Sequence, residues 1–206
     1  MGEHRAGCPA RAAACKIKME DLLADLTSGD DSRAERAIPA LVKLGEAAIP
    51  PLVELTRSDD PDIRWWGVCA LAASPHTRTE DLIAHLSDSA PEVRAAAALA
   101  LCSHPGEEAI PALIRTLADE DPLTAGLAGN ALVRVAGSAV PSLLEVMQEA
   151  PANVRILALR ALSEIRDHRA IPVMMKCLND NESALLQYWA QQGLERLGLD
   201  MVYIKP

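Results

Sequence analysis

The sequence predicts an all-α fold, a right-handed α-solenoid (superhelix) of about five two-helix repeats with helical caps. The first observation is a leucine that recurs at steps of 30, 30, 31, 30 and 32 residues, at Leu41, Leu71, Leu101, Leu132, Leu162 and Leu194. The second is composition: half of the 206 residues are hydrophobic, yet Phe is absent and aromatic residues make up 2%, so the core must be aliphatic. Such cores suit closely packed helices better than sheets, in which β-branched and aromatic residues are favoured.

The third observation is a pair of proline motifs that alternate along the chain. One combines Pro with an apolar residue and Arg, as in Pro61–Arg64 and Pro91–Arg94, and the other is apolar-Pro, as in Ile110–Pro111. Pro is tolerated in the first helical turn, because the N–H that it lacks would have no partner within the helix. Breakers such as Gly45 and Gly137 separate the motifs, so each repeat should contain a helix A, a turn, a helix B and a turn.

The expected helices follow in chain order from these motifs. They are a capping helix at 19–27, A/B pairs at about 32–44/49–57, 61–73/79–87, 91–103/107–118, 122–136/140–149 and 152–165/170–179, and a closing helix at 183–197. In the third pair the apolar residues Val93, Ala97 and Leu101 share one face of helix A at helical spacing. One hairpin cannot bury both of its faces, so the hairpins should stack on one another.

Tails are expected on both sides of this array, which should span residues 19–199. Residues 1–18 are basic and Ala-rich and lack the apolar stretch of a secretory signal, which predicts a disordered N-terminal tail. Residues 200–206 should form a C-terminal tail. Met19 begins the first clear helix. The sequence therefore leaves open whether residues 1–18 belong to the natural protein.

The third unit resembles a known repeat family. Its residues PEVRAAAAL, followed by EEAIPALIRTL, are similar to the short HEAT-like repeats of proteins related to phycobilisome lyases, and the resemblance extends over residues 31–197. It implies an armadillo-like α-solenoid. For function, it implies a non-enzymatic scaffold that binds a partner protein or peptide on the concave helix-B face. The alternative is a phycobilisome-lyase-like subunit or chaperone that acts on a tetrapyrrole-bearing protein.

Some residues depart from the repeat pattern. Pro39 lies inside the first helix A and should kink it. Gly126 and Gly129 each lower helix propensity by about 1 kcal/mol relative to Ala, so the helix at 122–136 should be the softest of the A helices.

Arginines and aspartates repeat in register with the array. The arginines are Arg64, Arg94 and Arg155, and the aspartates of the neighbouring turns are Asp60, Asp88 and Asp121. We expect ion pairs and turn hydrogen bonds that hold the repeats in register, with an anion site as the alternative.

Charge and cysteine content exclude several classes of protein. With 29 acidic and 20 basic side chains the net charge is −9, which disfavours nucleic-acid binding through phosphates. The five cysteines show no metal-type spacing, which indicates reduced thiols and a cytoplasmic location. No stretch approaches 18 uninterrupted apolar residues, so no membrane span is expected.

No catalytic arrangement is recognisable in the sequence. The adjacent Glu3 and His4 lie in the expected tail, which disfavours the paired His-Glu ligands of a di-iron site, and no phosphate-binding glycine motif occurs. The sequence therefore predicts a protein that is not an enzyme and that has no cofactor and no metal.

The aligned positions of the B helices supply most of the candidate partner contacts. They are Glu54, His85, Arg115, Glu145 and Lys176. Their alternating charges and lack of aromatic residues disfavour a nucleic-acid groove, whereas a mixed groove suits a protein segment. A solvated face without a partner stays the alternative, and the oligomeric state is open.

The few aromatic residues fall at two neighbouring repeat positions. Trp66 and Trp189 align with the core position of Ala96, which predicts that they are buried. Trp65 and Tyr188 align with an expected solvated position, so Trp65 is a further candidate partner contact, with partial burial as the alternative.

Overall fold

The computed structural model describes residues 9–179 and 183–199, and these residues form helices and turns with no strand among them. The chain forms two compact units, residues 1–77 and residues 78–206. The expectation of one continuous array over residues 19–199 stays a prediction.

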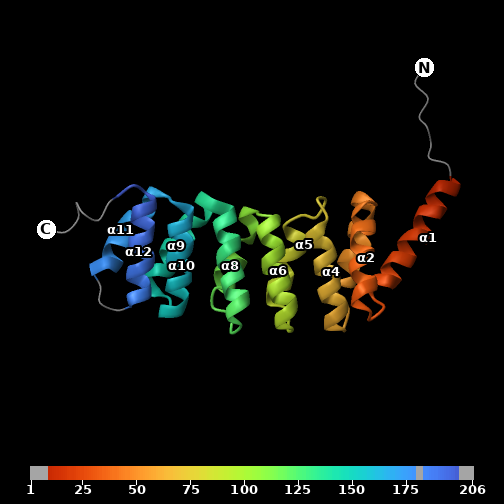
Figure 1. Cartoon of the computed structure of the whole chain (residues 1–206), viewed down its shortest axis with the longest axis horizontal. Helices are drawn as coiled ribbons and strands as arrows, with labels where there is room; N and C mark the ends of the chain where they lie inside the picture. The colour runs from red at the N-terminus through yellow and green to blue at the C-terminus, as the bar shows by residue number, and fades with distance from the viewer. Residues whose placement is uncertain (1–8, 180–182, 200–206) are drawn as a thin grey trace, which may run out of the picture. The chain divides into compact units, whose positions relative to one another are not determined.

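Unit 1 contains two successive hairpins. Its elements are α1 (Pro9–Leu26), α2 (Asp31–Val42), the 3₁₀ turn η1 (Gly45–Ala48), α3 (Ile49–Leu55) and α4 (Pro61–Ala73). In unit 1, α1 packs on α2, and α4 packs on both α2 and α3 (Figure 1). Asp30 caps α2 by accepting a hydrogen bond from the backbone N–H of Arg33 at 3.1 Å, and Asp60 caps α4 by accepting one from Asp62 at 2.9 Å.

The first helix begins earlier than the sequence analysis predicted. It starts at Pro9, so residues 9–18, expected to be a disordered tail, are helical. Alanine and the long basic side chains of this segment have high helix propensity, which the tail assignment undervalued. The remaining tail residues, 1–8 and 200–206, lie outside the described residues.

Unit 2 contains the other repeats. Its elements are α5 (Glu80–Ile83), η2 (Ala84–Ser87), α6 (Pro91–Ser103), η3 (Glu107–Ala109), α7 (Ile110–Thr116), α8 (Pro122–Val135), η4 (Ala136–Ala139), α9 (Val140–Glu149), α10 (Ala152–Ile165), η5 (His168–Ala170), α11 (Ile171–Asn179) and α12 (Ala184–Arg196). The A helices α6, α8, α10 and α12 pack side by side in chain order (Figure 1), and the B helices α7, α9 and α11 pack against them. The predicted alternation of A and B helices is confirmed.

The six recurring leucines form the centre of the packing. Each is at most 1% exposed, which confirms them as core. Alanine is the most frequent residue type among the other buried residues, and its small side chain lets neighbouring helices approach closely.

The segment Pro122–Glu149 is apolar and long enough to cross a membrane by length and composition alone. It is not one continuous helix, because α8 ends at Val135 and Ala136 has a φ of 61° before α9 begins at Val140. Both helices pack against other repeats within unit 2. Packing of repeat on repeat therefore accounts for the buried apolar residues of this segment, whereas Leu123 at its start is exposed.

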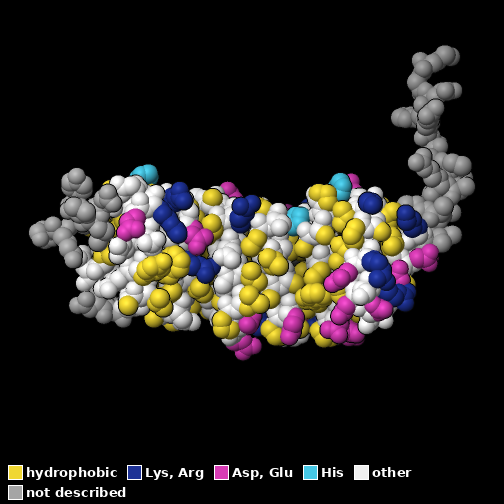
Figure 2. Space-filling view, in the orientation of Figure 1, with side chains coloured by type: hydrophobic (Ala, Val, Ile, Leu, Met, Phe, Trp, Pro, Cys, Tyr) yellow, Lys and Arg dark blue, Asp and Glu magenta, His cyan; other side chains and the backbone are white. Residues whose placement is uncertain are grey.

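The layer of A helices in unit 2 is apolar in places. Figure 2 shows hydrophobic side chains over α6 and α8, interspersed with charged ones. Large exposed hydrophobic residues on the A helices of this unit are Leu99, Leu123, Leu185 and Tyr188.

Candidate functional site

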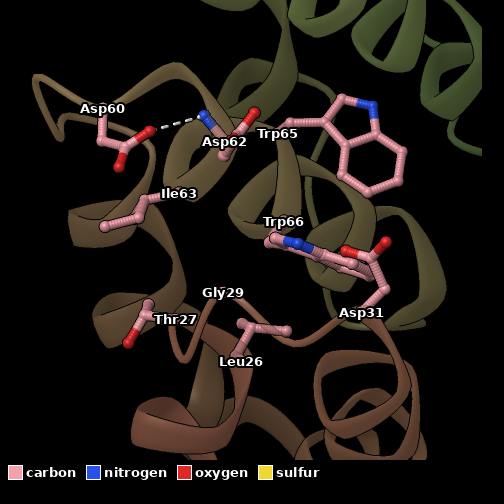
Figure 3. A pocket seen from close by; sticks show the side chains of 9 residues that line it. All are labelled: Leu26, Thr27, Gly29, Asp31, Asp60, Asp62, Ile63, Trp65 and Trp66. Carbon is pink, nitrogen blue, oxygen red and sulfur yellow. Dashed lines mark hydrogen bonds between the residues drawn. The ribbon is translucent and has the colours of Figure 1, made fainter.

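Hollows between neighbouring helices bring several candidate residues together. The first, the Trp65 hollow, lies in unit 1 and has a volume of about 380 Å³. Its lining residues are Leu26, Thr27, Gly29, Asp31, Asp60, Asp62, Ile63, Trp65 and Trp66 (Figure 3). All the charged residues among them are acidic.

The two tryptophans of this hollow pack edge to face. Their ring centroids are 4.7 Å apart at an interplanar angle of 75°, and both side chains are half-buried. The carboxylate of Asp31 lies beside the ring of Trp66 (Figure 3). For Trp65, the structure therefore shows the partial burial that was weighed against a partner contact.

The expected core burial of Trp66 and Trp189 is wrong. Both are half-buried, and Trp189 packs edge to face on Tyr188, which is 53% exposed, with centroids 5.2 Å apart. The other repeats carry Arg36, Ala96, Leu127 and Leu157 at this position. A Trp ring is larger than any of these side chains, so the space between the packed helices does not enclose it fully.

The second hollow, the Arg94 hollow, lies in unit 2 and has a volume of about 520 Å³. Its lining residues are Leu86, Ser87, Asp88, Arg94, Ala112, Arg115, Thr116, Asp119 and Glu120. Arg94 is 8% exposed, and its Nε and Nη2 donate to the two carboxylate oxygens of Asp119 at 2.8 and 2.9 Å. Its Nη1 also donates to the backbone carbonyls of Asp88 and Ser89.

This guanidinium holds one repeat on the next, as expected for Arg94, but its ion-pair partner is Asp119, which the sequence analysis did not name. Asp88, which it did name, accepts from Arg94 through its backbone carbonyl. Burial alone would raise the pKa of Asp119, but hydrogen bonds from Arg94 and from the backbone of Asp121 outweigh it, so the pKa lies below its ordinary value. Arg94 is therefore saturated by structural partners, and Arg115 is the lining cation that faces outward.

The third hollow, the Arg155–Lys176 hollow, also lies in unit 2 and has a volume of about 430 Å³. Its lining residues are Met147, Gln148, Arg155, Pro172, Val173, Lys176 and Cys177. Arg155 is half-buried at the start of α10, Lys176 is exposed on α11, and Met147 and Cys177 are buried. None of these lining residues is acidic.

The thiols of the A helices are poor nucleophiles. Burial raises the pKa of Cys69 to about 11. Burial also raises the pKa of Cys102, although the nearby positive charge of Arg134 opposes the rise. Both thiols are therefore protonated near neutral pH. Among the described residues, no group of three or more His, Cys, Asp and Glu side chains could hold a metal ion.

The structure places the predicted contact residues on four B helices, a 3₁₀ turn and one A helix. Glu54 is exposed on α3 and pairs with Arg57 at 2.8 Å, and His85 is half-buried in η2. The remaining B-helix candidates, Arg115, Glu145 and Lys176, are exposed on α7, α9 and α11. Arg155 lines the same hollow as Lys176, and the alignment of B helices missed it because it lies on the A helix α10.

Comparison with known proteins gives two sequence relationships. A family model described as HEAT repeats matches residues 79–155 and 134–195. The bilin biosynthesis protein RpcF of Synechococcus sp. (strain WH8020) is 34% identical over 99 residues, which are 48% of this chain and 47% of that protein. The chain thus spans about half the length of this curated relative.

Solved structures with the same fold support the architecture. The complex of CpcE and CpcF of phycocyanin lyase from Nostoc sp. PCC7120 has a TM-score of 0.52 at 20% identity, covering 96% of this chain and 80% of that one. The archaeal HEAT-like repeats protein from Thermococcus onnurineus NA1 has a TM-score of 0.61 at 14% identity, covering 89% and 80%. The predicted α-solenoid fold class is confirmed.

These findings correct one prediction. The expectation that the chain is not an enzyme is wrong, because its relative RpcF is a bilin biosynthesis protein. The prediction rested on the lack of recognisable nucleophiles, metal ligands and phosphate loops, which are signals of only some classes of enzyme.

Proposed function

This chain belongs to the HEAT-repeat family, and we propose that it is a lyase-type subunit that acts on a bilin or on the protein that carries the bilin. The observation that carries the proposal is the 34% identity over 99 residues with the bilin biosynthesis protein RpcF. The fold that the chain shares with CpcE and CpcF of phycocyanin lyase is consistent with it.

The chain's own contribution would be binding and orientation. Its described residues form rigid hairpins with hollows of about 380 to 520 Å³ between them. This range lies within that of small-molecule sites, roughly 300–1,000 Å³. A preformed surface of this kind can hold a reactive bilin in one orientation.

A protein partner is the second part of the proposal. The exposed B-helix residues Glu54, Arg115, Glu145 and Lys176, with half-buried His85 and Trp65, would contact the acceptor protein in the cytoplasm. Their mixed charges suit a protein surface and not a phosphate backbone. In affinity capture from the native host, Arg115→Glu and Trp65→Ala should each reduce recovery of the partner; unchanged capture by both variants would remove these contacts.

The bilin part of the proposal can be tested with phycocyanobilin added to the purified chain. We expect a saturable change in the visible absorbance of the pigment, because a bilin fixed in one conformation absorbs differently from a free one. Incubation with a bilin-free phycobiliprotein subunit, followed by zinc fluorescence on a denaturing gel, detects covalent transfer.

Two outcomes would separate the parts of this proposal. If the chain neither changes the absorbance of phycocyanobilin nor affects covalent transfer, the lyase-type role is wrong. The capture experiment alone would then test the protein-contact proposal. A mobility shift of duplex DNA at low salt would instead favour a nucleic-acid function.

A further inference from the structure

We propose that the Trp65 hollow of unit 1 binds an arginine side chain of a partner protein, with the guanidinium stacked on a tryptophan ring and paired with carboxylates at the rim. The assignment rests on the protein-contact part of the proposed function, and it names the chemistry of that contact. The partner segment that reaches this hollow is therefore basic.

A pair of aromatic side chains forms one wall of the hollow. The rings of Trp65 and Trp66 meet edge to face, and both side chains are only half-buried. Buried Leu26 and half-buried Ile63 complete the apolar part of the lining. Apolar ring surface in contact with water is unfavourable, and tryptophan is among the residues that contribute most to protein interfaces. A hollow of about 380 Å³ against these rings therefore suits a side chain of a partner.

The charge of the rim decides which side chain fits. The rim carries Asp31, Asp60 and Asp62, all of them exposed, and none of the lining residues is basic. Asp60 accepts a hydrogen bond from the backbone N–H of Asp62 at 2.9 Å. Within the part of the chain that the structure describes, the carboxylates of Asp31 and Asp62 make no hydrogen bond or ion pair. Two carboxylates are thus available to a cation, which favours a basic side chain over a neutral or acidic one.

Two basic residues close to the rim in sequence are engaged elsewhere. Arg33 on α2 pairs with Asp25, and Arg64 on α4 donates to two backbone carbonyls of the preceding turn at 3.0 Å. Helix α1 rises about 1.5 Å per residue, so the backbone of Arg11 near its start lies about 22 Å along the axis from Leu26. The negative charge of the rim is therefore not neutralised by these residues.

An arginine fits this lining better than a lysine. The carboxylate of Asp31 lies beside the ring of Trp66, so one planar group can stack on the ring and reach the carboxylate (Figure 3). A guanidinium does both, because it stacks on aromatic faces and its parallel N–H groups match the two carboxylate oxygens. A lysine ammonium is compact and strongly hydrated, so it loses more hydration beside the two rings.

The test is a titration of the full chain, with isotope-labelled nitrogen, followed through the tryptophan indole N–H signals by NMR. The probe is the acetylated and amidated peptide GGRGG. One matched control peptide carries citrulline, which has the shape of arginine without its charge, and another carries lysine. Trp189 of unit 2 is the internal reference, and replacement of each tryptophan by phenylalanine assigns the signals.

We expect the arginine peptide to shift the signals of Trp65 and Trp66 saturably and to leave that of Trp189 unchanged. The citrulline peptide should bind at least about tenfold more weakly, because it makes neither the ion pair nor the cation–π contact. The lysine peptide should bind about threefold more weakly than the arginine peptide, because it lacks the planar fork.

Two acidic variants test the contact on the side of the chain. Asp31→Asn should weaken binding of the arginine peptide by about fivefold, the upper value for one exposed ion pair. Asp31 is exposed, so its replacement leaves the packing intact. The matched control is Glu46→Gln, which removes one exposed negative charge from η1, outside the lining, and should change binding by less than about twofold.

Three results would overturn the site. They are equal binding of the arginine peptide and either control peptide, equal shifts of all three tryptophan signals, and equal losses in the two variants. Failure of the proposed function looks different. A chain that changes the absorbance of phycocyanobilin but binds no arginine peptide keeps the lyase-type role without this site. A chain that binds the arginine peptide but affects neither absorbance nor covalent transfer keeps the site without the lyase-type role.

Discussion

Single residues show how this chain uses charge for structure. Arg94 is nearly buried, and it bonds to a carboxylate of the next repeat and to two carbonyls of its own turn. A buried guanidinium is costly unless its donors are satisfied, and here the neighbouring repeat satisfies them. The pair therefore makes the stability of one repeat depend on its neighbour.

Asp119→Ala should lower the free energy of unfolding by about 3 kcal/mol, because it leaves the buried charge of Arg94 without its counter-charge. Urea denaturation measures the change. Glu120→Ala is the matched control: its side chain is 89% exposed and lies 3.6 Å from Arg94, so the effect should stay below about 0.5 kcal/mol. Equal losses in the two variants would show that burial of the pair is unimportant.

The ionisation of Asp167 should make the stability of the protein depend on pH in the acidic range. Hydrogen bonds from the side chain and backbone of Arg169 lower the pKa of Asp167 from 3.8 to about 2. Because the folded pKa is depressed, the stability that this carboxylate contributes is present above the unfolded pKa of about 3.9 and is lost as the pH falls towards 2. In a carboxyl NMR titration, Arg169→Ala should move the pKa of Asp167 back towards 3.8; a wild-type midpoint near 3.8 would contradict the assignment.

Individual helices differ in how tightly they pack. A Cβ added at Gly193 of α12 would lie 2.5 Å from Cε of Met174 and 3.1 Å from Cβ of Ser163. At Gly126 of α8 an added Cβ would meet nothing within 4 Å. The same residue type therefore serves close packing in one helix and leaves open space in the other.

Opposite effects of two Gly→Ala substitutions follow from this difference. Gly193→Ala should destabilise the protein, because overpacking costs about 1–3 kcal/mol and this exceeds the helix-propensity gain. Gly126→Ala should stabilise it by about 1 kcal/mol, since it gains propensity without a clash. Melting midpoints measure both, and a stabilising Gly193→Ala would show that the side chain of Met174 moves away at little cost.

Helix α8 should be the softest of the A helices, and this stays a prediction. It contains two glycines, and the guanidinium of Arg160 donates to the carbonyl of Gly126 at 3.1 Å from the neighbouring helix. Such a contact supports α8 from outside, but it does not restore its propensity. Amide exchange should be faster in residues 122–136 than in 91–103, and the reverse order would refute this.

At the scale of the whole molecule, a core mutation in one repeat should also destabilise the adjacent repeats, because the repeats stack on one another. Leu101→Ala should cost about 2–5 kcal/mol, because it removes a core side chain that is 1% exposed. Exchange should also accelerate in α8, which packs on α6. Leu99→Ala on the same helix is the control: Leu99 is 57% exposed, so its loss should be nearly neutral. An unchanged melting midpoint for Leu101→Ala would contradict the repeat register.

The order and type of the helices were predictable because each signal is local. Pro61, Pro91 and Pro122 each lie in the first turn of a helix, and the period of leucines reports which side of each helix is buried. The start of α1 was missed although Pro9 lies in its first turn, because the alanines and basic side chains that follow were assigned to a tail. The burial of Trp66 was overestimated, because alignment identifies a position but does not measure the space there.

By itself, the sequence determined the repeat architecture, since periodic hydrophobicity and proline placement act within a few residues of one another. It also carried the resemblance to lyase-related repeats. Tertiary structure alone decided which charged residues share a place: Arg94 bonds to Asp119, and Arg155 and Lys176 line one hollow. These pairs are 25 and 21 residues apart in the chain, and only the stacking of one hairpin on the next brings the members of each pair to one place.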